Sequence, residues 1–211
     1  RDALAALCLC GVVVSACGGG GGGTDIGSSS APPPAPGPAV DVSSVAAADA
    51  GSALPADWQR GTFMQIFVRS YADSDGDGIG DLRGLTGKLD YLKDMGVTGL
   101  WLMTITRSQD RDHGYAVSDY RNIEAQYGSL ADLDELLNQA HARGIGVIMD
   151  YVINHSAFQN PLFANSRAGD SNPYRAWYLW QNPRPSGWNI YGNNPWYGNA
   201  AGYYFAPFWD Q

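Results

Sequence analysis

The chain is poor in cysteine, and its few cysteines are confined to one end. All three, Cys8, Cys10 and Cys17, fall within the first 17 of the 211 residues. The sequence beyond Cys17 therefore cannot form a disulfide, a thiolate metal site or a cysteine nucleophile.

Basic residues are also scarce. The chain has 13 Lys and Arg against 21 Asp and Glu, for a formal net charge of -8. An acidic protein repels phosphate backbones, so we do not expect a nucleic acid partner. Neutral sugars are indifferent to that charge, and a divalent cation is attracted by it.

Long apolar runs are missing, apart from a short one at the start. Residues 3–16 have about the length of a signal-peptide core and are too short for a permanent membrane span. Small residues then lead into Cys17, a pattern that resembles the lipobox of bacterial lipoproteins. We predict a signal peptide over 1–17 and lipidation of Cys17, so that the exported protein touches the membrane only through this anchor. The alternative is an ordinary secretory signal.

Residues 18–57 lack the apolar residues that a packed core needs. Gly, Pro, Ser and Ala dominate this segment, so we predict a disordered linker. We expect one folded unit over 58–157, followed by an inserted subdomain over 158–211.

Strands and helices alternate across the folded unit expected over 58–157. The sequence predicts apolar strands at 62–68, 97–103 and 145–151, and amphipathic helices at 85–95 and 130–140. Ser129 and Asp132 form a predicted capping box, and Gly144 a helix stop. Continuous apolar strands predict parallel pairing, which suits a doubly wound sheet or a β/α barrel. The dinucleotide-binding version is disfavoured because the Gly-x-Gly-x-x-Gly turn is absent.

Residues 158–211 contain more than half of the chain's aromatic residues, and their periodicity is weak. This composition favours a loop-rich insertion after the third strand over a fourth α/β unit. Aromatic rings suit the apolar faces of pyranoses, but we expect most of them to fill the core of the insertion.

A loop after the first predicted strand combines alternating carboxylates with glycines. The oxygens of such a loop are ligands suited to Ca²⁺. We predict a calcium site formed by the four carboxylates and one backbone carbonyl of Asp73, Asp75, Asp77, Asp81 and Ile79. An EF-hand is disfavoured because Gly84 occupies the twelfth position, and the alternative is a solvated acidic turn.

Polar side chains follow the second and third predicted strands. Asp112 and Tyr115 come after the second, and Asp150, Asn154 and His155 follow the third. The carboxyl ends of parallel strands meet on one rim of a β/α barrel, where active sites are assembled. We expect the two groups to lie side by side and to hydrogen-bond and stack on a sugar.

Four segments together resemble the amino-terminal part of the catalytic domain of glycoside hydrolase family 13, the α-amylase family. They are Met64-Gln-Ile-Phe67, Gly99-Leu-Trp-Leu-Met103, Asp112-His-Gly-Tyr115 and Asp150-Tyr-Val-Ile-Asn-His155. The resemblance covers residues 58–211. It implies an α/β fold, the first part (about three strands) of a TIM (β/α)8 barrel with an aromatic-rich insertion after the third strand.

The resemblance also implies roles for individual residues. Tyr115 would stack on the sugar at the cleavage subsite, where Asp112 and His155 would hydrogen-bond hydroxyls. Asp150 would be a supporting carboxylate, not the nucleophile. Asn154 matches the position that ligates a second calcium in many α-amylases.

The implied activity is hydrolysis of α-1,4-glucans, such as starch and maltooligosaccharides, by a retaining mechanism. In the family the nucleophilic Asp and the acid/base Glu follow later strands, so we expect them beyond Gln211. The parent would be an enzyme, a monomer, and this piece alone inactive. The alternatives are an exo-acting α-glucosidase, a sucrose-cleaving or transglycosylating member, or a non-catalytic scaffold. The chain departs from the family at Thr104, where Pro is common, and at Ala116, where many members carry Asp.

Overall fold

The computed structural model describes residues 54–55, 57–109, 113–199 and 202–208. The predicted signal peptide over 1–17 with Cys17, and the predicted sugar ligand Asp112, lie outside these residues, as does nearly all of the predicted linker. None of the described helices is long and apolar enough to cross a membrane.

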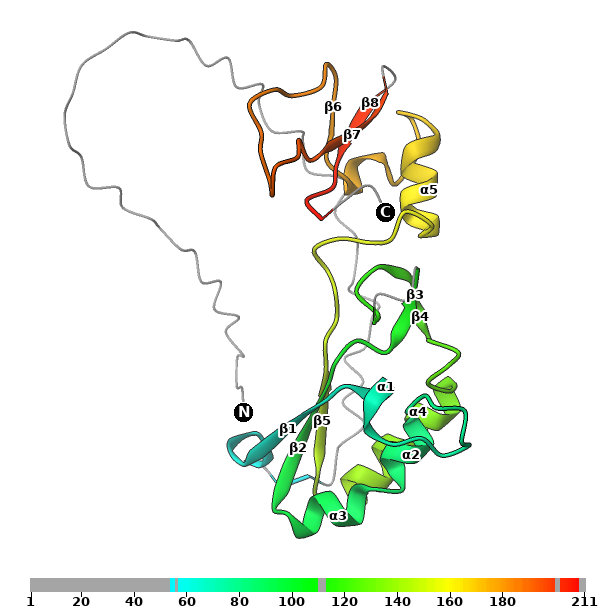
Figure 1. Cartoon of the computed structure of the whole chain (residues 1–211), viewed down its shortest axis with the longest axis vertical. Helices are drawn as coiled ribbons and strands as arrows, with labels where there is room; N and C mark the ends of the chain where they lie inside the picture. Colours follow the sequence, from blue (N-terminus) through cyan, green and yellow to red (C-terminus); the bar gives the residue numbers. More distant parts are fainter. Residues whose placement is uncertain (1–53, 56, 110–112, 200–201, 209–211) are drawn as a thin grey trace, which may run out of the picture. The chain divides into compact units, whose positions relative to one another are not determined.

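A parallel sheet forms the centre of the first part of the chain (Figure 1). Its strands are β1 (Thr62–Ile66), β2 (Val97–Leu102) and β5 (Gly146–Met149), in the order β1-β2-β5. Both strand pairs are parallel, as the continuous apolar runs predicted. The three predicted strands of a partial barrel are thus confirmed.

One helical turn precedes these strands, and further helices connect them. They are the 3-10 turn η1 (Trp58–Arg60), α1 (Val68–Tyr71), α2 (Leu82–Thr86), α3 (Leu89–Asp94) and α4 (Leu130–Ala142). The single helix predicted over 85–95 is wrong, because α2 ends at Gly87, whose amide donates to the carbonyls of Arg83 and Leu85. The first strand is also shorter than predicted, since the chain turns at Phe67, whose carbonyl accepts the Ser70 amide at 3.1 Å.

Helix α4 begins and ends as predicted. The capping box is complete: the Ser129 hydroxyl accepts from the Asp132 amide, and the Asp132 carboxylate accepts from the Ser129 amide. At the other end Gly144 has φ +75°, a conformation that favours glycine, and its amide donates to the His141 carbonyl at 2.9 Å. The chain can therefore turn directly into β5.

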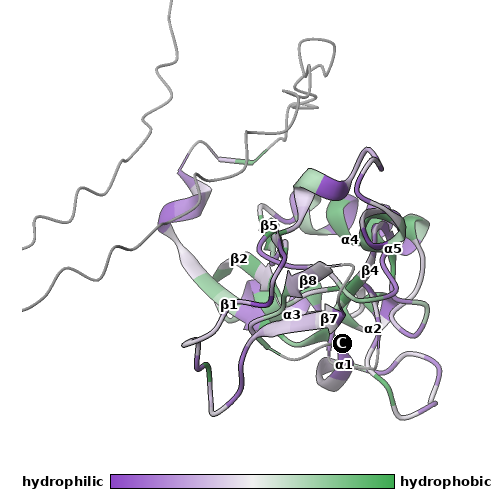
Figure 2. Ribbon diagram, turned by 90° about the horizontal axis from the view of Figure 1, so that it is seen from above, coloured by the Kyte–Doolittle hydropathy of each residue, from purple (hydrophilic) through white to green (hydrophobic). Residues whose placement is uncertain are grey.

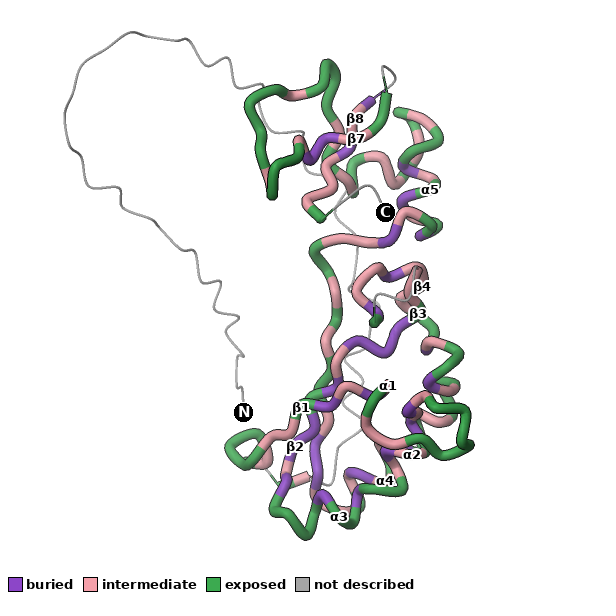
Figure 3. The backbone as a smooth tube through the Cα atoms, in the orientation of Figure 1, coloured by how far each residue is buried: buried purple, intermediate pink, exposed green. Residues whose placement is uncertain are grey.

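The core lies between the sheet and the helices. Leucines from β2, α2, α3 and α4 are fully buried there: Leu100, Leu102, Leu85, Leu92 and Leu136. Burial of each such side chain stabilises the fold by about 1.5–3 kcal/mol. Figure 3 shows the buried residues along β2 and the adjoining helices, and Figure 2 shows that α4 carries both hydrophobic and hydrophilic residues.

The opposite face of the sheet carries exposed side chains. Trp101 lies between the buried Leu100 and Leu102 on β2, so it points to that face and is 40% exposed. Its neighbours in register are Gln65 of β1, also exposed, and Ile148 of β5, which is 45% exposed. Among the described residues, Trp58 and Phe63 cover this face at Gly99 and Gly146, and the part at Trp101 and Ile148 is exposed.

An antiparallel pair that the sequence did not predict follows β2. It consists of β3 (Thr106–Ser108) and β4 (Val117–Ile123), with two register irregularities. Its strands escaped prediction because β3 has only three residues and β4 is mostly polar. The pair holds the loop on which Tyr115 lies.

The aromatic-rich segment folds around a separate small sheet. Its elements are α5 (Pro161–Ala168), the 3-10 turn η2 (Arg175–Trp177), β6 (Trp180–Gln181), β7 (Trp196–Asn199) and β8 (Gly202–Phe205). The strands pair antiparallel in the order β6-β8-β7. The described residues after β5 therefore form an insertion and not a further α/β unit. The weak periodicity of this segment predicted that arrangement.

Candidate functional site

Asp150 joins two strand ends at the carboxyl edge of the sheet. It directly follows β5, and its amide donates to the Leu102 carbonyl at 2.9 Å, extending the pairing with β2. Its Oδ1 accepts from Trp101 Nε1 at 2.6 Å, and its Oδ2 accepts from the Tyr115 hydroxyl at 3.0 Å. The sequence placed Asp150 and Tyr115 on one rim, but it did not identify Trp101 as the second donor.

Tyr115 is held so that its phenol remains protonated at neutral pH. Burial raises its pKa above the usual 10, and the hydrogen bond to Asp150 and the charge of that carboxylate raise the pKa further. A phenol that donates to Asp150 keeps its ring in one orientation. The aromatic face is then preorganised to pack against a ligand.

His155 lies behind Tyr115 on the chain that leaves β5. Its Nε2 is 3.0 Å from the Tyr115 carbonyl, and its Nδ1 is 3.3 Å from Asn154 Nδ2. A carbonyl only accepts, so Nε2 carries the proton and Nδ1 accepts from the amide. The Tyr120 hydroxyl also donates to the His155 carbonyl at 2.7 Å, so the backbone of this residue is fixed as well.

The turn before Tyr115 depends on a buried threonine. The Thr104 hydroxyl donates to the His113 carbonyl, and Gly114, at φ +100°, packs so closely that an added Cβ would lie 2.2 Å from Thr104 Oγ1. A proline, which is common at this position in the family, could not donate this hydrogen bond. Thr104 anchors the loop that carries Tyr115.

The predicted sugar-binding residues are thus brought together in part. Tyr115, His155 and Asp150 form one hydrogen-bonded cluster, whereas Asp112 lies outside the described residues. The sequence missed Phe208, whose ring lies 5.1 Å from that of His155 in an edge-to-face contact. No motif distinguished this phenylalanine from its many aromatic neighbours.

Most aromatic rings of the insertion pack on each other. Phe163 contacts Tyr178, Trp180 and Tyr204, with ring centroids 5.0–6.1 Å apart. Between these rings and the segment after β5 lies a cavity of about 480 Å³, which His155 and Phe208 help to line. Its size is within the range of small-ligand sites.

The acidic loop between α1 and α2 brings three carboxylates together. Oxygens of Asp73, Asp75 and Asp81 lie within 4.8 Å of one another. The Asp77 carboxylate instead accepts from the Ile79 amide at 2.7 Å. Three converging carboxylates in a loop of this kind fit a hard divalent cation such as Ca²⁺.

Backbone amides order the same loop. Asp73 accepts from Gly76 at 2.7 Å and from Gly78 at 2.8 Å, and these bonds lower the pKa of its carboxyl group. Asp81 accepts from the amides of Ser74 and Gly84, and the second of these bonds caps α2. The loop and the helix therefore share one carboxylate.

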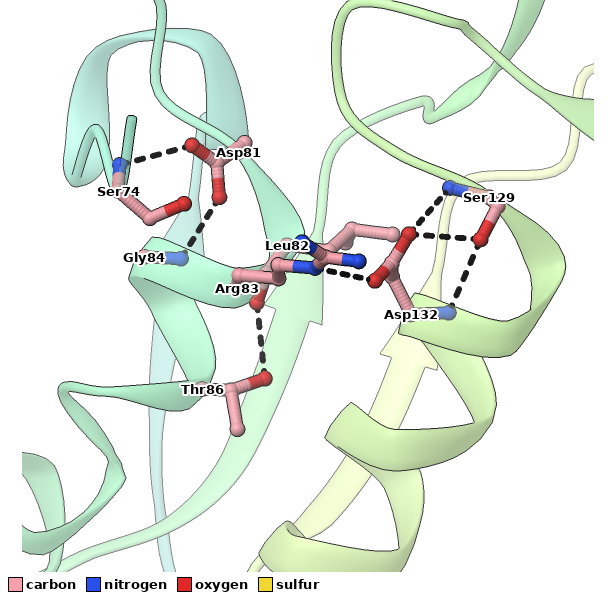
Figure 4. A network of polar contacts seen from close by, with 8 residues as sticks. All are labelled: Ser74, Asp81, Leu82, Arg83, Gly84, Thr86, Ser129 and Asp132. Carbon is pink, nitrogen blue, oxygen red and sulfur yellow. Dashed lines mark hydrogen bonds and ion pairs between the residues drawn. The ribbon is translucent and has the colours of Figure 1, made fainter. Parts of the chain in front are cut away.

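A further ion pair connects α2 to the start of α4 (Figure 4). Arg83 Nε lies 2.6 Å from Asp132 Oδ1, and the other oxygen of Asp132 accepts from the amide and hydroxyl of Ser129. The hydrogen bond from the Ser129 hydroxyl lowers the pKa of Asp132 most, followed by that from Arg83. The acidic loop and the capping box of α4 thus belong to one polar network.

A parallel sheet with a polar cluster at its carboxyl edge fits the first part of a β/α barrel. The family described as alpha amylase, catalytic domain, matches residues 65–211. The chain belongs to this family, glycoside hydrolase family 13.

Its relatives include several kinds of glycosidase. It is 42% identical over 154 residues to alpha-amylase 3 of Dictyoglomus thermophilum, covering 73% of this chain and 30% of that protein. It is 40% identical over 161 residues to an oligo-1,6-glucosidase of Heyndrickxia coagulans, covering 73% of this chain and 29% of the other.

Two solved structures have the same fold. The trehalose-6-phosphate hydrolase TreA of Bacillus licheniformis superposes with a TM-score of 0.67 at 38% identity, over 71% of this chain and 28% of its own. A variant of the trehalulose synthase MutB gives the same TM-score, the same identity and the same coverage of each chain. The chain thus spans about 30% of the length of these relatives.

Proposed function

We propose that this chain is the sugar-binding front part of an exported, retaining hydrolase of α-glucosides, acting on α-1,4-glucans. The observation that carries the proposal is the cluster at the ends of β2 and β5, where Asp150 holds both Trp101 and Tyr115. The activity belongs to a longer protein, since the relatives are about three times as long as the matched segment. In such a protein the nucleophilic Asp and the acid/base Glu come from outside residues 1–211.

Each clustered residue has a defined role in this proposal. Tyr115 stacks on a pyranose ring at the cleavage subsite, and Asp150 supports it without forming a covalent bond to the sugar. His155 Nε2 is held by the Tyr115 carbonyl, so Nδ1 is the atom that accepts from a sugar hydroxyl. The 3.3 Å contact between Nδ1 and Asn154 Nδ2 then breaks when the sugar binds. Asp112 supplies a second hydrogen bond to the sugar.

A second candidate is an exo-acting enzyme for short α-glucosides. Its support is the names of relatives, which include oligo-1,6-glucosidases and α-glucosidases at 40–44% identity. To separate the two, the full-length protein is assayed on amylose, maltotriose, isomaltose and sucrose. Rapid loss of amylose chain length supports endo action on α-1,4-glucans, and release of glucose from chain ends supports the exo-acting candidate.

A non-catalytic scaffold is the competing class. It predicts binding of maltooligosaccharides by the full-length protein without hydrolysis. Absence of turnover on all four substrates, with retained sugar binding, would overturn the enzymatic proposal.

We also propose that the acidic loop binds calcium and braces the connection between β1 and α2. Asp73, Asp75 and Asp81 would be the main ligands, with Asp77 and the Ile79 carbonyl completing the set and Asn154 serving a second ion. Bound Ca²⁺ supplies no chemistry in this proposal. It neutralises the loop carboxylates and keeps α2 in place.

The calcium proposal is tested by thermal melts of the chain with Ca²⁺ and with a chelator. We expect a higher melting temperature with Ca²⁺, and loss of that difference in Asp73→Asn. The matched variant Asp77→Asn, which lies outside the cluster of three, should retain more of it. Identical melts of the unmodified chain in both conditions would contradict the proposal.

Finally, we propose lipid attachment at Cys17 and location at the bacterial cell envelope. The support is the apolar segment 3–16 followed by small residues and Cys17. Mass spectrometry of the protein from a bacterial host should find a lipid on Cys17 and none in Cys17→Ala. An unmodified secreted protein cleaved elsewhere would favour an ordinary signal peptide.

A further inference from the structure

A second cleft lies within the aromatic-rich insertion. It has a volume of about 490 Å³ and involves none of the clustered residues at the ends of β2 and β5. Its walls come from α5 and from the strands β7 and β8, together with Arg184 of the connecting loop. The residues used below are Phe158, Arg167, Arg184, Trp196, Tyr197 and Tyr203.

Two of the three arginines of the insertion line the cleft. The basic residues of 158–208 are Arg167, Arg175 and Arg184, and the sequence of this segment has one acidic residue, Asp170. Asp170 is paired with Arg175 at 2.7 Å. Both remaining arginines line the cleft, so an otherwise acidic chain presents two cations at one place.

The two guanidinium groups are held by contacts that leave donors available. Arg167 lies 3.9 Å above the centre of the Phe158 ring. Arg184 Nε donates to the Trp196 carbonyl at 2.7 Å, and its guanidinium lies 5.9 Å from the Tyr203 ring. Among the described residues, neither arginine forms an ion pair with a carboxylate. The Nη groups of Arg184 therefore remain available to a ligand.

A buried donor in the wall of the cleft also lacks a partner. Trp196 is 6% exposed, and its Nε1 is the buried side-chain atom without a hydrogen bond in the described part of the chain. Its ring packs edge-to-face on Trp188 and Phe205, so the indole is a rigid part of the wall and not a donor that a ligand in the cleft reaches. The two guanidinium groups prefer an oxygen acceptor with negative charge.

We propose that this cleft binds a small oxyanion, a phosphate or carboxylate group, through Arg167 and Arg184. Tyr197 and Tyr203 also line the cleft, and either ring offers a surface on which a sugar ring carrying the oxyanion can pack. The cleft is also much larger than a single water or phosphate needs. An uncharged sugar would leave both cations without a counter-charge.

The test is a titration of the complete 211-residue chain, labelled with ¹⁵N, at constant ionic strength. The probes are glucose 6-phosphate, glucuronate, inorganic phosphate and glucose. We expect saturable shifts of the Trp196 indole resonance, identified by its absence in Trp196→Phe, with the oxyanion probes and not with glucose. Tighter binding of glucose 6-phosphate than of inorganic phosphate indicates a sugar-borne oxyanion, and equal binding indicates a free one.

Calorimetry of arginine variants gives an independent check that does not depend on Trp196→Phe folding. Arg167→Gln and Arg184→Gln should each weaken oxyanion binding at least tenfold. Arg121→Gln, an exposed arginine of β4, is the matched control and should bind as the unmodified chain does. Absence of saturable binding, an equal response to glucose, or unchanged affinity in both cleft variants would overturn the proposal.

Discussion

At the scale of single residues, Asp150 is the side chain on which the candidate site depends. One carboxylate accepts from the Trp101 indole and from the Tyr115 hydroxyl. An asparagine can accept from only one of these two donors, because its amide nitrogen would face the other. The site therefore needs a carboxylate here whether or not that group takes part in chemistry.

We expect Asp150→Asn to lower kcat/KM of the full-length protein by about 10–100-fold, the equivalent of one hydrogen bond to a charged group. Asp134→Asn, an exposed carboxylate of α4, is the control and should leave kcat/KM unchanged. Steady-state kinetics on maltotriose decides the point. Equal kinetics in the two variants would remove Asp150 from the site.

A second residue, Tyr120, has an altered titration. Burial raises the pKa of its phenol to about 12, with smaller contributions from Tyr178 and Tyr151. A pKa raised in the folded state means that the folded protein holds this proton more tightly than the unfolded chain does. The stabilisation is present below pH 10 and is lost as the pH rises toward 12.

Absorbance titration of the tyrosines measures this effect. The difference between the unmodified chain and Tyr120→Phe should be one phenol that ionises near pH 12. Ionisation of that phenol near pH 10 in the folded protein would show that Tyr120 is not buried as described.

Residue patterns predicted the members of the site better than they predicted its contacts. Asp150, Tyr115 and His155 were recognisable because they follow apolar strands in a familiar order. Trp101 was assigned only to a strand. The sequence alone does not show which strands pair, and so it does not show that the Trp101 side chain lies beside Asp150. Phe208 could not be singled out, because its role depends on how the insertion folds back toward His155.

At the scale of elements, the start of α4 is fixed by one carboxylate with two functions. Asp132 completes the capping box with Ser129 and pairs with Arg83 of α2. Arg83 is 76% exposed, so the ion pair contributes little, and most of the stabilisation comes from the cap. Loss of a cap costs about 1 kcal/mol.

Asp132→Ala should therefore lower the free energy of unfolding by about 1 kcal/mol in urea titrations. Because the pKa of Asp132 is lowered in the folded state, this contribution is present above pH 3.8 and is lost as the pH falls below it. The difference between the variant and the unmodified chain should shrink accordingly in acid. Asp134→Ala, also in α4 and exposed, serves as the control. A matching loss in that control would contradict the role of the cap.

Most helices and strands followed from the sequence, but one helix boundary and one strand pair did not. The leucine spacing across 85–95 is continuous, and it does not reveal that Gly87 closes one helix before another begins. The β3–β4 pair was missed because its pairing depends on contacts between residues 9 to 17 positions apart. Local patterns carry little information on such pairing.

At the scale of the whole molecule, the sheet is only partly covered. Trp101 and Ile148 are exposed neighbours on one face of the sheet, and β5 lies at its edge. Exposed apolar faces and strand edges favour association. The 211-residue chain on its own should therefore self-associate.

Sedimentation velocity tests this expectation. Ile148→Lys should shift the chain toward the monomer, because it places a charge on the exposed face. Leu130→Lys, a change of similar size at an exposed position of α4, should not. A monomeric unmodified chain at all concentrations would contradict the account of the open face.

We propose that the reacting carboxylates lie in the rest of the parent protein, so this chain alone should lack activity. The chain has about the size of three strands and an insertion, whereas a complete barrel needs about 250 residues. It should bind sugar weakly and release no reducing sugar from starch. Measurable release by the purified chain would show that the reacting carboxylates lie within it.

The most direct test of the central claim uses the full-length protein with maltotriose and follows the first-formed product by proton NMR. A retaining α-glucosidic hydrolase releases the α-anomer first, before mutarotation produces the β-anomer. We expect initial α-anomer from the unmodified protein, formed at least tenfold more slowly by Asp150→Asn. Initial β-anomer, or no hydrolysis by a folded full-length protein, would contradict it.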